Sequence, residues 1–129
     1  MSGSYLFDAN IVVAHFNKDP KVRKFLLEND GIYISSTALG ELWFGALKSA
    51  RVKANLELIE DFVKTVPVVS CDFNTAKIFG EIKVKLKARG KPIPDNDVWI
   101  AASAMQHDLV VVTRDSHFNE IAGLKLETL

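Results

Sequence analysis

Apolar residues along this chain follow two different spacings. Short runs that are apolar throughout are typical of strands buried on both faces, whereas apolar residues that recur every three or four positions are typical of helices packed on one face. The clearest strand of this kind is "LVVVT" at 109–113. The clearest helix is "VKANLELIEDFVKT" at 52–65, because Leu56, Ile59 and Phe62 share one stripe. The chain therefore combines buried strands with amphipathic helices.

Turn-forming residues divide the rest of the chain into elements of the same two kinds. Pro20 interrupts one helix, Gly31 precedes a strand and Gly90 ends a long helix. We expect strands at 5–8, 32–35, 66–70, 109–113 and 124–128. We expect helices at 11–16, 21–29, 36–49, 52–65, 72–90 and 95–107, and a helical turn at 117–123.

Strands that alternate with helices predict an α/β fold, with a parallel sheet between two layers of helices. The length of 129 residues suits a single domain over 1–129 and is sufficient for a real hydrophobic core. Ligands of such sheets bind beyond the carboxyl ends of the strands. Polar residues that follow the strands are therefore the first candidates for function.

Composition narrows the class of protein. Hydrophobic residues make up 48% and charged residues 25% of the chain, which is typical of soluble globular proteins. No apolar run approaches the roughly 20 residues of a membrane span, and the first residues do not resemble a signal peptide. Cys71 is the only cysteine, which excludes an internal disulfide and a thiolate cluster. We expect a cytoplasmic protein that does not bind membranes.

The charges are balanced overall but unevenly distributed. A net charge of zero argues against a protein that coats nucleic acid along its whole surface. Basic residues nevertheless concentrate at 48–53 and 77–91. Solvated helix faces explain such stretches, and so does a surface that holds a short polyanion. The residues that we expect to contact such a polyanion are Lys48, Arg51, Lys87, Arg89, Lys91 and Arg114.

Four acidic residues are the strongest candidates for chemistry. Asp8 ends the first strand and Asp115 follows the strand at 109–113, so both belong at the carboxyl edge of the sheet. Glu41 lies among apolar residues inside a helix, and Asp97 opens the apolar helix "VWIAASAM". Each has an ordinary alternative: a helix cap or helix start, a lysine pair, or a turn. Together, however, four acids at one edge repel one another unless a cation neutralises them.

The residue types indicate which cation that is. Oxygen-rich sites without Cys or His suit Mg²⁺ or Mn²⁺, which often bridge protein carboxylates and phosphates. We expect surface or core-edge positions for His15, His107 and His117, although His117 is close enough to Asp115 in sequence to approach the site as a weaker candidate. P-loop, dinucleotide-binding and serine-hydrolase motifs are missing. The residues thus predict a metal-dependent site for phosphodiester cleavage.

Four stretches of the sequence resemble one known family, in order and with compatible spacing. They are "YLFDAN" at 5–10, "TALGELWFGALKS" at 37–49, "GKPIPDNDVWIAASAMQHDL" at 90–109 and "VVTRDSHFNEIAGLKLE" at 111–127. Over nearly its whole length the chain resembles the PIN-domain toxins of the VapC type, which are small ribonucleases of prokaryotic toxin–antitoxin pairs. The resemblance implies a Rossmann-like, three-layer PIN fold with a central, mostly parallel sheet of five strands.

The resemblance also implies the roles of individual residues. The four positions that bind Mg²⁺ or Mn²⁺ in the family fall on Asp8, Glu41, Asp97 and Asp115. Asn10 and Thr113 are expected to support them, and Asp95 is expected to act as a helix-start or outer residue. Ala9 departs from the family, which more often has Thr or Ser there. The loss of that hydroxyl affects only the surroundings of Asp8.

The implied function is that of a Mg²⁺- or Mn²⁺-dependent endoribonuclease, with a tRNA or ribosomal RNA loop as substrate and metal-activated water as the nucleophile. The implied partners are a cognate VapB-type antitoxin and a second copy of the chain in a homodimer. The helices at 36–49 and 52–65, with Trp43 and Phe44, are candidates for those contacts. The alternatives are a catalytically silent PIN-fold module that binds RNA or protein, and a phosphatase with Asp8 as nucleophile.

Overall fold

Five strands form one parallel sheet, in the order β3-β2-β1-β4-β5, in the computed structural model, which describes residues 3–129. The strands are β1 (Tyr5–Phe7), β2 (Ile32–Ser35), β3 (Val68–Val69), β4 (Val110–Thr113) and β5 (Leu126–Thr128). Every strand pair is parallel. The predicted α/β class is therefore confirmed, and the sheet is parallel throughout rather than mostly parallel.

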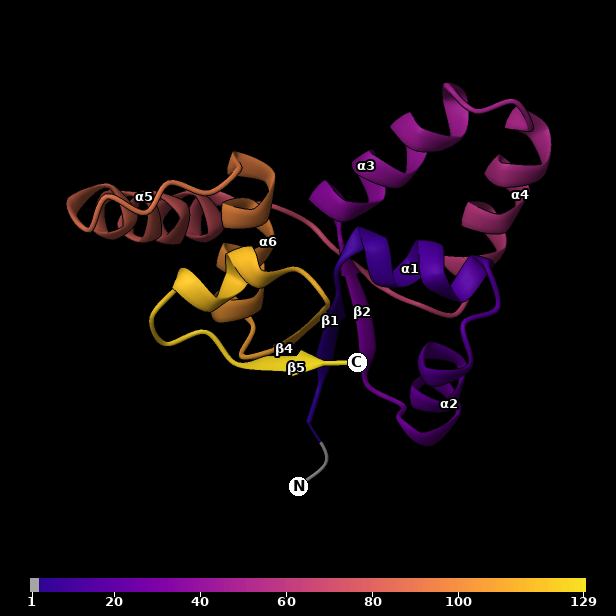
Figure 1. Ribbon diagram of the computed structural model, residues 1–129, viewed down its shortest axis with the longest axis horizontal. Coiled ribbons are helices and arrows are strands. Elements are labelled where there is room, and N and C mark those ends of the chain that lie inside the picture. Colours follow the sequence, from indigo (N-terminus) through magenta and orange to yellow (C-terminus); the bar gives the residue numbers. More distant parts are fainter. Residues whose placement is uncertain (1–2) are drawn as a thin grey trace.

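Helices cover both faces of this sheet. They are α1 (Ala9–Phe16), α2 (Pro20–Glu28), α3 (Ser36–Leu47), α4 (Val52–Phe62), α5 (Phe73–Ala88) and α6 (Asp95–Gln106), with the short 3-10 helix η1 (Ser116–Glu120) before β5. Figure 1 shows α1 to α4 on one side of the central strands and α5 and α6 on the other. This division follows from right-handed crossovers, because the chain reverses its direction across the sheet after β3. None of the helices within residues 3–129 has the length and apolar character that crossing a membrane requires.

Several element boundaries differ from the prediction, and two of these differences have clear local reasons. The helix expected at 11–16 begins at Ala9, because the carbonyl of Asp8 already accepts hydrogen bonds from the N–H groups of Ile11 and Val12. The strand expected at 66–70 keeps only Val68–Val69 as β3. It lies at the edge of the sheet, and Pro67 contributes a carbonyl but no N–H to the pairing with β2.

The core is formed by the central strands and by α6. Leu6 and Phe7 of β1 and Val111 and Val112 of β4 are fully buried. Helix α6 is buried over most of its surface as well, because small alanines let it approach the sheet closely. Burial on this scale fixes the position and the rotation of α6. Its first turn, which carries Asp97, is consequently held at a fixed place beside the ends of the strands.

Ser35 makes the turn from β2 into α3 and gives a first testable prediction. Its buried hydroxyl accepts a hydrogen bond of 3.1 Å from the N–H of Ala38, as an N-cap does. Ser35→Ala should lower the free energy of unfolding by about 1 kcal/mol, measured by urea denaturation. Ser103→Ala is the matched control, since the buried hydroxyl of Ser103 has no hydrogen-bond partner among residues 3–129. Equal losses in the two variants would contradict the capping role.

Candidate functional site

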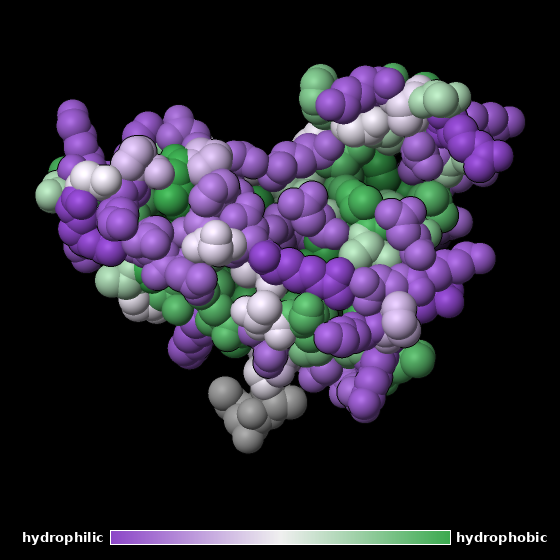
Figure 2. Space-filling model, in the orientation of Figure 1, coloured by the Kyte–Doolittle hydropathy of each residue, from purple (hydrophilic) through white to green (hydrophobic). Residues whose placement is uncertain are grey.

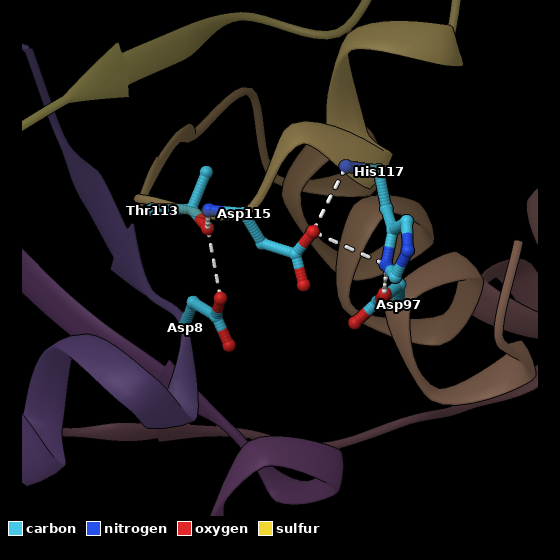
Figure 3. Close-up of polar contacts among 5 residues, drawn as sticks. All are labelled: Asp8, Asp97, Thr113, Asp115 and His117. Atoms are coloured by element: carbon cyan, nitrogen blue, oxygen red, sulfur yellow. Dashed lines mark hydrogen bonds and ion pairs between the residues drawn. The ribbon is translucent and has the colours of Figure 1, made fainter.

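Two acids and a threonine meet where β1 and β4 end. The two strands are neighbours, with Phe7 opposite Val112, so Asp8 and Thr113 leave the sheet side by side. The hydroxyl of Thr113 donates to Oδ2 of Asp8 at 2.8 Å and accepts from the N–H of Asp115 at 2.9 Å. Figure 3 shows Asp8 and Asp115 on the two sides of this hydroxyl. One side chain thereby links the carboxylate of Asp8 to the backbone of Asp115.

Asp97 reaches the same place from the first turn of α6. Its Oδ2 lies 2.9 Å from Nδ1 of His117, and the same nitrogen lies 3.1 Å from Oδ1 of Asp115. The N–H of His117 also donates to Oδ1 of Asp115, at 2.9 Å. One potential ligand atom each from Asp97, Asp115 and His117 lie within 4.8 Å of one another. These three residues therefore form a tight cluster beside Asp8, as Figure 3 shows.

Glu41 approaches the site from α3. Its Oε1 is buried and has no hydrogen-bond partner in the described part of the chain. Burial raises the pKa of Glu41, and the charges of Asp8 and Asp97 raise it further, while the side chain of Asn96 opposes the rise. A buried carboxylate without a partner is costly. The lysine pair that could have explained Glu41 is not found among residues 3–129.

The electrostatics of the cluster disfavour its charged form. Burial raises the pKa of Asp8, although the hydroxyl of Thr113 opposes this, and the charge of Asp97 raises it again. Burial likewise raises the pKa of Asp97, against the hydrogen bond from His117. In turn, the hydrogen bond to Asp97 raises the pKa of His117. The three carboxylic acids thus bind protons more readily in the folded protein than in the unfolded chain.

These pKa shifts predict how the stability of the metal-free protein depends on pH. The ordinary values are 3.8 for aspartate and 4.5 for glutamate, and the folded state holds Asp8, Glu41 and Asp97 above them. Where a folded pKa is raised, the unfolded state binds fewer protons, so stability falls as pH rises through the folded pKa. The melting temperature of EDTA-treated protein should therefore increase from about pH 7.5 to about pH 5. Glu41→Gln should flatten that slope, and an unchanged slope would contradict the assignment.

The structure brings the four predicted acids to one edge of the sheet, and their catalytic and metal-binding roles stay predictions. Thr113 contacts Asp8, as its supporting role requires. Asn10 lines a groove of about 440 Å³ together with Glu41. Asp95 turns away from the cluster and pairs with Lys83 at 2.9 Å. It is the first residue of α6, which fits the predicted helix-start position.

The six basic residues expected to contact a polyanion fall into two groups. Lys48, Arg51, Lys87 and Lys91 are exposed and form no ion pair within residues 3–129, although the ammonium group of Lys48 lies 4.7 Å from the centre of the Phe44 ring. Both arginines of the second group make contacts within the protein. Arg89 donates to the carbonyl of Glu120 at 2.7 Å. Arg114 donates to Asp19 at 2.9 Å and lowers the pKa of that carboxyl to about 2. The lysines and Arg51 are therefore freer to bind phosphates, a role that remains a prediction.

His117 is the residue that sequence reasoning underrated. An exposed or core-edge position was expected, and its side chain is indeed 46% exposed. Its ring nitrogen nevertheless touches two of the four acids. The sequence evidence for this approach to the site was the position of His117 two residues after Asp115, at the start of a helical turn. The contact with Asp97, which is 20 residues away along the chain, carries no sequence signal.

The sequence of this chain matches a protein family and individual members of that family. The model of the PIN domain family matches residues 5–124. A tRNA(fMet)-specific endonuclease VapC from Shigella flexneri is 35% identical over 126 residues, which cover 95% of this chain and 96% of that protein. Ribonuclease VapC2 from Haemophilus influenzae is 32% identical over the same share of both chains.

Solved structures agree with the sequence comparison. A DNA-bound VapBC complex from Salmonella typhimurium contains a chain with a TM-score of 0.92 and 32% identity, and the match covers 98% of both chains. VapBC2 from Rickettsia felis, bound to a DNA fragment from its promoter, gives a TM-score of 0.88 at 29% identity, with 97% of this chain and 98% of that chain covered. The sheet and the helices described above are thus those of a known fold.

Proposed function

Because this chain belongs to the PIN-domain family, and within it to the VapC ribonuclease toxins, we propose that it is a divalent-metal-dependent endoribonuclease. One observation carries the proposal: Asp8, Asp97 and Asp115 lie together at the carboxyl edge of a parallel sheet, and Glu41 is close enough for the charges of Asp8 and Asp97 to raise its pKa. Ligands of such sheets bind at this edge.

The donor atoms fit Mg²⁺ or Mn²⁺. They are carboxylate oxygens, which these ions prefer, and Oε1 of Glu41 is buried without a hydrogen-bond partner among the described residues. Asp8, Glu41, Asp97 and Asp115 are the residues that would hold the ion. When bound, the ion neutralises charge on the phosphate and makes water more acidic. Its charge would also offset the repulsion that, after burial, raises the pKa values of Asp8, Glu41 and Asp97.

The protein's own residues hold the reacting groups in place. Thr113 fixes the carboxylate of Asp8, and the N–H of His117 fixes that of Asp115. Helix α6 holds Asp97 rigidly, because most of the helix is buried. Oε1 of Glu41 accepts no hydrogen bond from residues 3–129, so we assign it the task of accepting the proton of the attacking water.

We propose RNA as the substrate, in the form of an exposed loop such as those of tRNA. Lys48 and Arg51 lie at the end of α3, and Lys87 and Lys91 lie at the end of α5. Figure 1 shows these two helices on opposite sides of the molecule, and Figure 2 shows a hollow between them. Cations on both sides can hold the phosphates that flank the cleaved bond. RNA loops present the unstacked nucleotides that such a hollow admits.

We further propose that a VapB-type antitoxin binds the apolar groove formed by α1, α3 and α4. Val13, Phe44, Leu47 and Leu58 are exposed in or beside it, and Glu41 lies at its end. A segment in the groove would therefore block the acids directly. Of the two predicted aromatic contacts, Phe44 is exposed, while Trp43 is half-buried against the core. The predicted homodimer can use the exposed end of α3 as well.

Cleavage assays on the antitoxin-free protein test the nuclease proposal. Total tRNA should be cut in the presence of MgCl₂ or MnCl₂ and left intact in the presence of EDTA. Single-stranded DNA of similar length should be cut far more slowly. Glu41→Gln should lose activity, whereas the same substitution at the exposed Glu81 should not. Cleavage that persists in EDTA would refute the metal site, and RNA binding without cleavage would favour the silent binding module.

A further inference from the structure

We propose that His117 is itself a ligand of the divalent ion, and that its imidazole makes the site favour Mn²⁺ over Mg²⁺. This inference rests on the metal site of the proposed function and adds a nitrogen to a ligand set expected to consist of oxygen alone. The main evidence is the position of Nδ1 of His117, which lies 2.9 Å from Oδ2 of Asp97 and 3.1 Å from Oδ1 of Asp115.

These distances suit either a proton or a metal ion between Nδ1 of His117 and the two carboxylate oxygens. A proton on Nδ1 can form a hydrogen bond to either oxygen, but it cannot point straight at both. Adjacent ligands of an octahedral ion with bonds of ~2.1 Å are about 3.0 Å apart. The nitrogen and the two oxygens are already spaced in this way. A small movement of the three side chains would therefore admit a cation where the shared proton lies.

The backbone holds the imidazole in this position. His117 is the second residue of η1, whose N-cap is Asp115, and its own N–H binds the Asp115 carboxylate. The next residue, Phe118, is fully buried and anchors η1 in the core. Asp97 comes from the rigid start of α6. The three donors are thus presented by two fixed elements, which is what a metal site requires.

The chemistry of the donor set gives the predicted selectivity. Mg²⁺ is a hard ion that prefers oxygen ligands and retains its water, whereas imidazole suits transition-metal ions. Mn²⁺ accepts carboxylate ligands, as Mg²⁺ does. It is also a transition-metal ion, the first and weakest-binding one of the affinity series. Replacing one oxygen ligand by an imidazole nitrogen should therefore weaken Mg²⁺ more than Mn²⁺.

Pulsed electron paramagnetic resonance of Mn²⁺ bound to the full chain tests this inference without an activity measurement. The wild-type protein should show hyperfine coupling to a directly bound imidazole nitrogen. His117→Ala should abolish that coupling and lower the affinity for Mn²⁺ by about tenfold or more, while the affinity for Mg²⁺ changes much less. His107→Ala is the matched control, because that histidine is exposed at the far end of α6.

The possible results separate this inference from the proposal beneath it. Bound Mn²⁺ without nitrogen coupling in the wild-type protein would overturn the role of His117 and leave the carboxylate site standing. Equal losses of Mn²⁺ and Mg²⁺ affinity in His117→Ala would overturn the selectivity. A wild-type protein that binds neither ion would overturn the metal site and, with it, this inference. The wild-type spectrum decides the first point even if His117→Ala does not fold.

Discussion

Asp8→Asn should reduce RNA cleavage by about a thousandfold or more and, at the same time, raise the melting temperature of the metal-free protein. The substitution keeps the shape of the side chain and its ability to accept the hydrogen bond from Thr113. It removes a negative charge that burial and the neighbouring Asp97 disfavour. In the proposed metal site, the same charge that costs stability without an ion is the one that binds the ion. Cleavage rates and thermal melts in EDTA measure the two effects.

Asp8→Asn should lower the cleavage rate but raise the melting temperature, and this combination distinguishes a metal ligand from a helix cap. If Asp8 served only as the N-cap of α1, asparagine would replace it without loss, because the two residues cap helices equally well. Asp61→Asn, on the exposed end of α4, is the control for the loss of one negative charge. It should change neither property. Full activity of Asp8→Asn, or a melting temperature below that of the wild type, would contradict the assignment.

Phe118→Ala should lower the free energy of unfolding by about 3–5 kcal/mol, which is the usual cost of truncating a buried aromatic side chain. The ring of Phe118 is fully buried and is the main anchor of η1. A loss of this size is a large part of the ~5–15 kcal/mol that stabilises a typical domain. Urea denaturation at neutral pH measures it.

Phe73→Ala is the matched control for this truncation, because the ring of Phe73 is 84% exposed. Its effect should stay within about 0.5 kcal/mol. Phe118→Ala should also weaken metal binding, since η1 carries His117 and follows Asp115. A cost below about 1 kcal/mol would mean that η1 refills the cavity and that the site does not depend on this anchor.

The fold was predictable because its strands are apolar throughout and alternate regularly with helices. "LVVVT" at 109–113 could hardly be anything but a buried strand. The convergence of Asp8 and Asp115 was predictable too, since parallel neighbours end at the same edge. Glu41 was less certain, because a lysine partner was a reasonable expectation and only the structure shows that Oε1 has none among residues 3–129.

Contacts between distant segments were beyond the reach of sequence patterns. The ion pair of Arg114 with Asp19 joins residues 95 positions apart, so neither residue signals the other. Arg114 looked like a phosphate ligand for the same reason that any exposed arginine does. For His117 the sequence showed only part of the picture: its neighbour Asp115 was visible and its exposure was expected, but its contact with Asp97 depends on how η1 folds against α6.

The hydrogen bond between Thr113 and Asp8 spans 105 positions, so it joins the two ends of the chain. Strand β1 lies in the middle of the sheet, yet β4, its neighbour on one side, is among the last elements to be synthesised. A ribosome still translating this message therefore carries a nascent chain whose acids have not yet been assembled. The order of the strands therefore delays assembly of the acidic cluster until β4 and η1 have been synthesised.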